Sequence, residues 1–102
     1  MHMNHDWEVL GFEFDGFDWS DEKAKNNRRK HGVGFEEATQ IFENAILARH
    51  EIHETEDRYA AIGLSGARAL VVVFTERSGN IRIISARKAT ASERRRYGAH
   101  FG

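Results

Sequence analysis

Three consecutive strand patterns in the second half of the chain constrain the fold most strongly. Apolar and β-branched residues, which are typical of strands, dominate residues 58–64, 68–75 and 81–87. Only two short loops, each containing a glycine, separate these segments. Connections this short join antiparallel neighbours, so the three segments predict a meander. Residues 69–74 are apolar throughout, which indicates a central strand covered on both faces.

The first half of the chain predicts one strand and two helices. Phe12–Asp15 alternates apolar and acidic side chains, as a half-buried strand does. A helix should begin after Ser20, a good N-cap, and end in a basic last turn before Gly32. This first helix has few apolar residues, so it is either largely exposed or carries a polar face. A second helix starts at Gly34, with an apolar face formed by Phe35, Ala38, Ile41 and Phe42.

A further strand and a closing helix complete the predicted order. Ala45–Arg49 reads as a strand, and the polar residues 50–57 connect it to the meander. Thr90 and Glu93 form a capping box at the start of a helix over Ala89–Tyr97. The order is strand, two helices, four strands and a helix. It predicts an α+β fold with a mainly antiparallel sheet.

Charge is divided unequally between the two halves of the chain. Residues 1–57 carry 14 acidic and 6 basic side chains, whereas residues 58–102 carry 2 acidic and 9 basic ones. Eight of the nine late cations are arginines, whose planar donors match phosphate. A basic half favours a polyanionic partner such as nucleic acid. The alternative is that the acidic half folds back and neutralises the basic half.

Composition excludes several classes of protein. The 102 residues contain no cysteine, so there is no disulfide framework, thiol nucleophile or cysteine zinc site. No apolar run approaches the roughly 18–20 residues of a membrane span. The N-terminus lacks the plan of a signal peptide. We therefore expect one soluble domain in the cytoplasm.

The last predicted hairpin supplies the first candidate site. If its turn centres on Gly79-Asn80, Arg77 lies opposite Arg82, an arrangement that destabilises a sheet unless an anion lies between the charges. In this register Val72, Phe74, Ile81 and Ile83 form the core face, and the opposite face carries Arg77, Thr75, Arg82 and Ile84. The two arginines form an anion site, or they extend into water or pair with acids.

The first helix supplies the second candidate site. Lys23, Asn27 and His31 are four residues apart and therefore line one face of the helix, next to Lys30. A histidine there is suited to proton transfer near neutral pH. The competing interpretation is that His31 only binds free carbonyl groups in the last turn of the helix.

The polar connection and the last helix contain weaker candidates. His50 and His53 lack a third ligand at a clear spacing, so we expect a solvated loop and no metal. Glu56 and Arg58 point to one side of a strand, either as an acid–base group with a phosphate clamp or as a surface ion pair. The Arg94-Arg95-Arg96 run forms a solvated face or contacts phosphates. Tyr97 is a packing residue or a platform for stacking.

Three blocks of the sequence carry specific motifs that follow one another in order. The first block contains Trp19-Ser20-Asp21-Glu22-Lys23, Asn27, Lys30-His31-Gly32-Val33 and Phe35-Glu36-Glu37-Ala38. The second contains Glu56-Asp57-Arg58-Tyr59 and Ile62-Gly63, and the third contains Thr75-Glu76-Arg77, residues 81–87, Ala89 and residues 93–97. Taken together, these blocks resemble the BrnT toxin family. They span a single domain over residues 12–97. Residues 1–11 form an N-terminal extension, either flexible or an extra edge strand. Gly34 replaces the usual serine N-cap.

The resemblance implies a RelE-like fold with two N-terminal helices and one C-terminal helix. It also implies a metal-independent endoribonuclease that inhibits translation and needs no cofactor. The implied partner is an antitoxin with a ribbon-helix-helix DNA-binding part, through which alone the toxin would contact operator DNA. Membranes play no part in this scheme.

A ribonuclease without a metal uses the 2′-hydroxyl of RNA as nucleophile and needs a base, an acid and cations. The catalytic candidates are Arg58, Arg77, Arg82 and Arg87, with one or two of His31, Glu56 and Tyr97. The RNA-binding candidates are Lys23, Lys30, Arg94 and Arg95. The alternative function is a non-catalytic module that binds RNA or antitoxin and acts as a corepressor in a DNA-bound complex.

Overall fold

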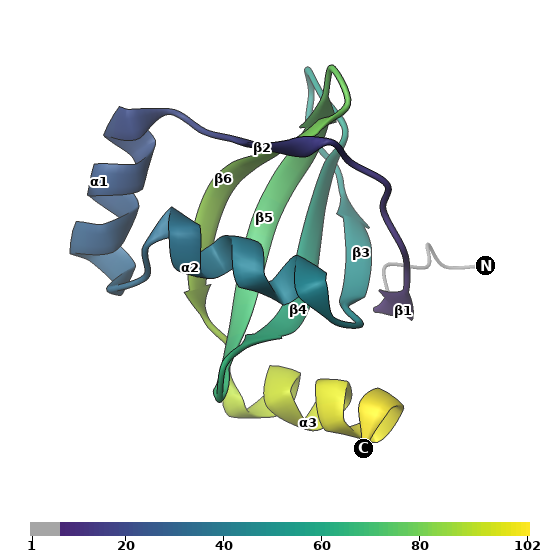
Figure 1. Cartoon of the computed structure of the whole chain (residues 1–102). Coiled ribbons are helices and arrows are strands. Elements are labelled where there is room, and N and C mark those ends of the chain that lie inside the picture. The colour runs from purple at the N-terminus through teal and green to yellow at the C-terminus, as the bar shows by residue number, and fades with distance from the viewer. Residues whose placement is uncertain (1–6) are drawn as a thin grey trace.

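The computed structural model describes residues 7–102, whose strands form one six-stranded sheet in the order β1-β3-β4-β5-β6-β2. All neighbouring strands are antiparallel except β2 and β6, which are parallel. Figure 1 shows α2 crossing one face of the sheet, and α3 at the end of the strands opposite the β5–β6 hairpin. In chain order the elements are β1 (Glu8–Val9), β2 (Gly16–Asp18), α1 (Asp21–His31), α2 (Phe35–Thr39), the 3-10 helix η1 (Gln40–Glu43), β3 (Leu47–Glu51), β4 (Arg58–Ser65), β5 (Arg68–Arg77), β6 (Asn80–Lys88) and α3 (Ala91–Phe101).

Apolar side chains cover both faces of the central strand β5, as its sequence predicts. On one face Leu70, Val72 and Phe74 pack with residues of α2 and η1, including Phe35 and Ile41. On the other face Val71 packs with Leu47 and Ile62, against Tyr97 and Phe101 of α3. The meander and the α+β class are therefore confirmed. Among the described residues, no helix combines the length and the apolar character that crossing a membrane requires.

The start of the chain differs from the predicted order. Two short strands, β1 and β2, precede α1 where one strand was predicted, so the two helices are not the N-terminal elements of the fold. The predicted strand at Phe12–Asp15 is also wrong, because only its last residue bonds to the sheet region, where Asp15 N donates to Gly79 O of the turn, and pairing with β6 starts at Gly16. Phe12 and Phe14 instead place their rings against the aromatic residues Tyr59, Phe74, Phe17 and Phe42.

The N-terminal extension is partly described. Glu8 and Val9 form an edge strand against β3, which is one of the two predicted alternatives. The Trp7 side chain is buried in the core that α3 covers. Residues 1–6 lie outside the described part of the chain.

The β5–β6 turn lies one residue earlier than predicted. Ser78 and Gly79 both have positive φ, at 53° and 82°, as the two central residues of a type I′ turn do. Arg77 consequently pairs with Asn80, and Arg82 pairs with Thr75, so the predicted direct opposition of Arg77 and Arg82 is wrong. The two arginines are diagonal neighbours on one face of the sheet. The predicted core face of this hairpin is confirmed, since Val72, Phe74, Ile81 and Ile83 are all buried.

Candidate functional site

A row of polar side chains crosses five strands of the sheet. It lies on the face that α3 covers only at the end of the sheet away from the β5–β6 turn. The strand register aligns Glu51 of β3, Arg58 of β4, Thr75 of β5, Arg82 of β6 and Asp18 of β2. Directly paired residues of adjacent strands point to the same face. We call these five residues the transverse row. It places one arginine on each side of a central threonine and one carboxylate at each end.

Carboxylates hold both arginines of the transverse row. Arg58 Nε donates to Glu56 Oε2 at 2.8 Å, and Arg82 donates to Asp18 Oδ1 at 2.8 Å. The side chains of Arg58 and Arg82 are 25% and 29% exposed, so solvent still reaches them. A guanidinium has five N–H donors, and one bond to a carboxylate leaves others for a phosphate. These ion pairs therefore orient the arginines without occupying all of their donors.

Thr75 links the row to the polar connection between β3 and β4. Its side chain is buried, and its hydroxyl donates to the backbone oxygen of Asp57 at 2.6 Å. This bond fixes the segment that carries Glu56. The bond to Arg58 holds the pKa of the Glu56 carboxyl below its usual value, so Glu56 is ionised at neutral pH. Sequence reasoning placed Thr75 on the correct face but gave it no role.

Arg87 and Arg49 extend the basic surface along the same face. Arg87 donates two hydrogen bonds to Glu93, at 2.8 and 2.9 Å, and thereby ties β6 to the first turn of α3. This pairing lowers the pKa of Glu93 to about 2 and raises that of Arg87. Arg49 pairs with Glu51 at 3.0 Å and stacks over the Trp7 ring at 4.4 Å. Arg49 was missed by the sequence analysis because it precedes the basic half.

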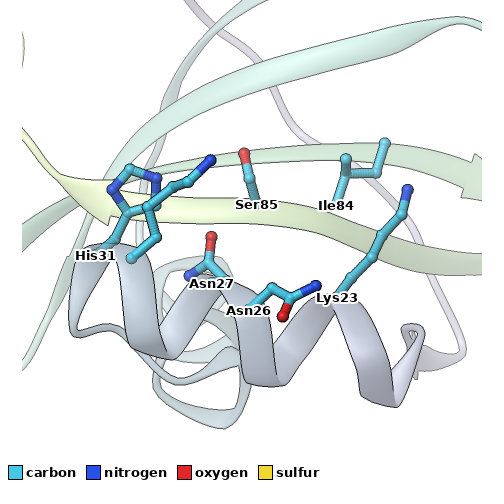
Figure 2. A pocket seen from close by; sticks show the side chains of 7 residues that line it. Lys23, Asn26, Asn27, His31, Ile84 and Ser85 are labelled. Carbon is cyan, nitrogen blue, oxygen red and sulfur yellow. The ribbon is translucent and has the colours of Figure 1, made fainter.

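A second feature is the groove between α1 and β6, with a volume of about 200 Å³. Figure 2 shows Lys23, Asn27 and His31 rising from α1 toward β6, the strand that carries Ile84 and Ser85. Ile84 has no partner in β5 because the register shifts there, and both residues line the groove. The groove is lined by Lys23, Asn26, Asn27, Lys30, His31, Ile84 and Ser85. The helix is also largely exposed, with Asn27 as its buried residue, so both of the expected descriptions of α1 apply.

Asn27 positions this groove by attaching α1 to the edge of β6. Its Nδ2 donates to the backbone oxygens of Ala86 at 2.8 Å and Val33 at 3.0 Å, and its Oδ1 accepts from Ala86 N at 3.1 Å. The side chain therefore takes the place of a neighbouring strand beyond the end of β2. The helix itself begins and ends as predicted, with Ser20 accepting from Lys23 N and Gly32 in the left-handed region.

The remaining candidates are spread over the molecule. Arg77 lies beyond the transverse row near the end of the β5–β6 hairpin. Tyr97 packs against Phe101 and donates to the backbone oxygen of Ala45 at 2.9 Å, and burial raises its pKa. Arg94 donates to the backbone oxygen of Ala89, whereas Arg95 is exposed on α3.

The histidines of the polar connection bind neighbouring side chains and backbone. His50 Nε2 lies 3.2 Å from Asp57 Oδ1, and His53 Nδ1 accepts from the backbone nitrogen of Thr55. Within residues 7–102, no group of three or more His, Cys, Asp or Glu side chains is arranged to hold a metal ion.

The fold and the site define a small α+β protein whose sheet presents arginines suited to a polyanion. The chain belongs to the family described as the ribonuclease toxin BrnT of type II toxin–antitoxin systems, whose model matches residues 19–93. This confirms the resemblance seen in the sequence. A search of curated proteins found no match. Membership of a type II system gives the protein an antitoxin partner.

Proposed function

We propose that this protein is a metal-independent endoribonuclease that cleaves RNA on the transverse row and so inhibits translation. The observation that carries the proposal is the placement of Arg58 and Arg82 on the two strands that flank Thr75. Two guanidinium groups on either side of Thr75 can both donate hydrogen bonds to the oxygens of a single phosphate. RNA cleavage through a phosphorane concentrates negative charge at such a point, where fixed cations stabilise it.

Glu56 is the general base of the proposed reaction. It is ionised, and its 2.8 Å bond to Arg58 holds it beside the phosphate position. Glu56 takes the proton of the 2′-hydroxyl, whose oxygen attacks phosphorus. The bond from phosphorus to the 5′ oxygen breaks, and that oxygen takes a proton from solvent. The products are a 2′,3′-cyclic phosphate and a free 5′-hydroxyl.

The groove between α1 and β6 holds the RNA strand next to the cleaved bond. His31 lies in this groove with Lys23 and Lys30, not on the transverse row, so we assign all three to binding of the flanking phosphates. Arg94 and Arg95 add distant positive charge from α3. Tyr97 serves packing in this scheme, because its hydroxyl is bound to Ala45. The antitoxin, through a ribbon-helix-helix part, would mediate contact with operator DNA.

The test is incubation of purified protein with end-labelled RNA in excess EDTA. We expect cleavage to persist and to leave 2′,3′-cyclic phosphate ends. Arg58→Ala and Arg82→Ala should each abolish cleavage, whereas Arg96→Ala, which removes an exposed arginine of α3, should not. Activity that disappears in EDTA and returns with a divalent ion would refute metal independence. RNA binding without any cleavage would favour the non-catalytic module.

A further inference from the structure

A cavity of about 440 Å³ opens beside the transverse row. Its walls are Thr55, Glu56, Asp57, Tyr59, Thr75, Glu76 and Arg77. Figure 1 shows the β3–β4 connection and the β5–β6 hairpin lying side by side at the end of the sheet opposite α3. Thr75 belongs to the row, and Glu56 is bonded to Arg58 of the row. A nucleotide whose phosphate lies over Thr75 therefore has its base next to this cavity.

An aromatic ring with a fixed position forms part of the cavity wall. The Tyr59 ring stacks on Phe74, with a centroid distance of 5.6 Å and an interplanar angle of 25°. The rings of Phe12 and His50 form T-shaped pairs with the Tyr59 ring, with centroid distances of 5.0 and 5.4 Å. Aromatic side chains held in this way are the usual platforms for unpaired bases of RNA.

Charged groups of both signs surround that ring. Burial raises the pKa of Tyr59, and the negative charges of Glu76 and Asp57 raise it further, so both carboxylates lie near the phenol. Arg77 also lines the cavity, but its side chain leaves β5 on the opposite face from Glu76, because Glu76 pairs with Ile81 on the core face. Asp57 is bonded to His50 and Glu56 to Arg58. Among the described residues Glu76 forms no ion pair, so its carboxylate is the acceptor most available to a ligand.

We infer that this cavity binds a guanine base of the RNA substrate. This inference rests on the proposed function. Guanine presents two adjacent donors, N1–H and the N2 amine, which match the two oxygens of a carboxylate. Its O6 and N7 are adjacent acceptors, which match the fork of a guanidinium. Glu76 and Arg77, which line the cavity from opposite faces of β5, supply these two complementary groups.

The other bases fit the same cavity less well. Adenine and cytosine each carry one amine next to a ring nitrogen that is a hydrogen-bond acceptor. A carboxylate repels such an acceptor. Uracil places its single N–H between two oxygens. Only guanine joins a pair of donors to a pair of acceptors, so the cavity should select guanine beside the cleaved bond.

The first experiment measures cleavage of short RNAs that differ at one nucleotide next to the cut. We expect kcat/KM to fall by roughly tenfold or more when guanosine is replaced by inosine, which lacks the N2 amine. Glu76→Ala should remove the difference between guanosine and inosine. Glu43→Ala, which removes an exposed acid of η1 outside the cavity, should retain it.

The second experiment separates this inference from the proposed catalysis. Calorimetry compares binding of the 3′-monophosphates of guanosine, adenosine, cytidine and uridine to the wild-type protein and to Glu76→Ala. Guanosine selectivity that depends on Glu76 supports the inference, even if no RNA is cut. Cleavage without base preference, together with equal binding of the four nucleotides, overturns the inference and leaves the ribonuclease intact. If the protein neither cleaves RNA nor distinguishes the four nucleotides, both the proposed function and this inference are overturned.

Discussion

At the scale of single residues, Asn27 is the side chain on which the position of α1 depends. It is 6% exposed and joins the helix to Ala86, which is 59 residues away in the sequence. Asn27→Ala should lower the free energy of unfolding by roughly 2–4 kcal/mol, because it leaves buried backbone groups of Ala86 and Val33 without partners. Urea denaturation measures the loss. Asn26→Ala, at the exposed neighbouring position, should change stability by less than about 0.5 kcal/mol. Equal effects of the two variants would show that the bonds of Asn27 contribute nothing.

Glu93 makes the stability of the protein depend on pH. Its pKa is depressed to about 2, first by the bond to Arg87, so its stabilising contribution is complete above the unfolded pKa and is lost as the pH falls toward 2. Glu93→Gln keeps a capping side chain but removes the ion pair. The partial exposure of Arg87 screens the pair, so we expect a loss on the order of 1–2 kcal/mol at pH 7. The unfolding free energy of this variant should fall less than that of the wild type between pH 5 and pH 2. A parallel decline in both proteins would contradict this role.

At the scale of elements, the left-handed geometry of the β5–β6 turn sets the register of the hairpin. Gly79 has a φ of 82°, and a Cβ added there would lie 3.0 Å from Asp15 Oδ2. Gly79→Ala should therefore destabilise the protein by about 1–2 kcal/mol. Gly98→Ala is the matched control, since its Cβ would meet nothing within 4 Å, and alanine in a helix should stabilise by about 0.5–1 kcal/mol. Thermal unfolding compares the two. Stabilisation by Gly79→Ala would mean that the turn does not need its left-handed geometry.

The elements that sequence reasoning found are those defined by local pattern. Meander strands, caps and the apolar face of α2 depend on residues close together in the chain, and they were predicted well. β2 and the docking of Asn27 depend on partners about 60 residues away, which no local period reveals. For the candidate site, the sequence brought Glu56 and Arg58 together correctly but placed Arg77 opposite Arg82. A one-residue error in the turn is enough to change the partners across a hairpin.

At the scale of the whole molecule, the division of charge has a structural explanation. Within residues 7–102, three ion pairs join an acid of the first half to an arginine of the second: Glu56–Arg58, Glu37–Arg68 and Asp18–Arg82. The pair Glu56–Arg58 is local, but Glu37–Arg68 and Asp18–Arg82 join distant parts of the chain, so part of the acidic half does fold back on the basic half. It neutralises individual arginines while leaving the face of the transverse row partly exposed. A partner with acidic groups can approach this face as RNA phosphates would.

The antitoxin should accordingly cover the transverse row and exclude RNA physically. We expect an interface of at least ~1,200 Å², the lower bound for a specific stable complex, and an association rate that falls steeply with salt. Replacing Arg77 and Arg82 together by alanine should weaken both RNA cleavage and antitoxin capture in stopped-flow binding. The double variant of Arg95 and Arg96 removes the same charge from exposed positions on α3 and should slow capture less. If the first double variant stops cutting RNA but still binds antitoxin at the wild-type rate and affinity, the antitoxin binds elsewhere. Inhibition would then require a change transmitted to the row, through an element such as α1 or the β3–β4 connection.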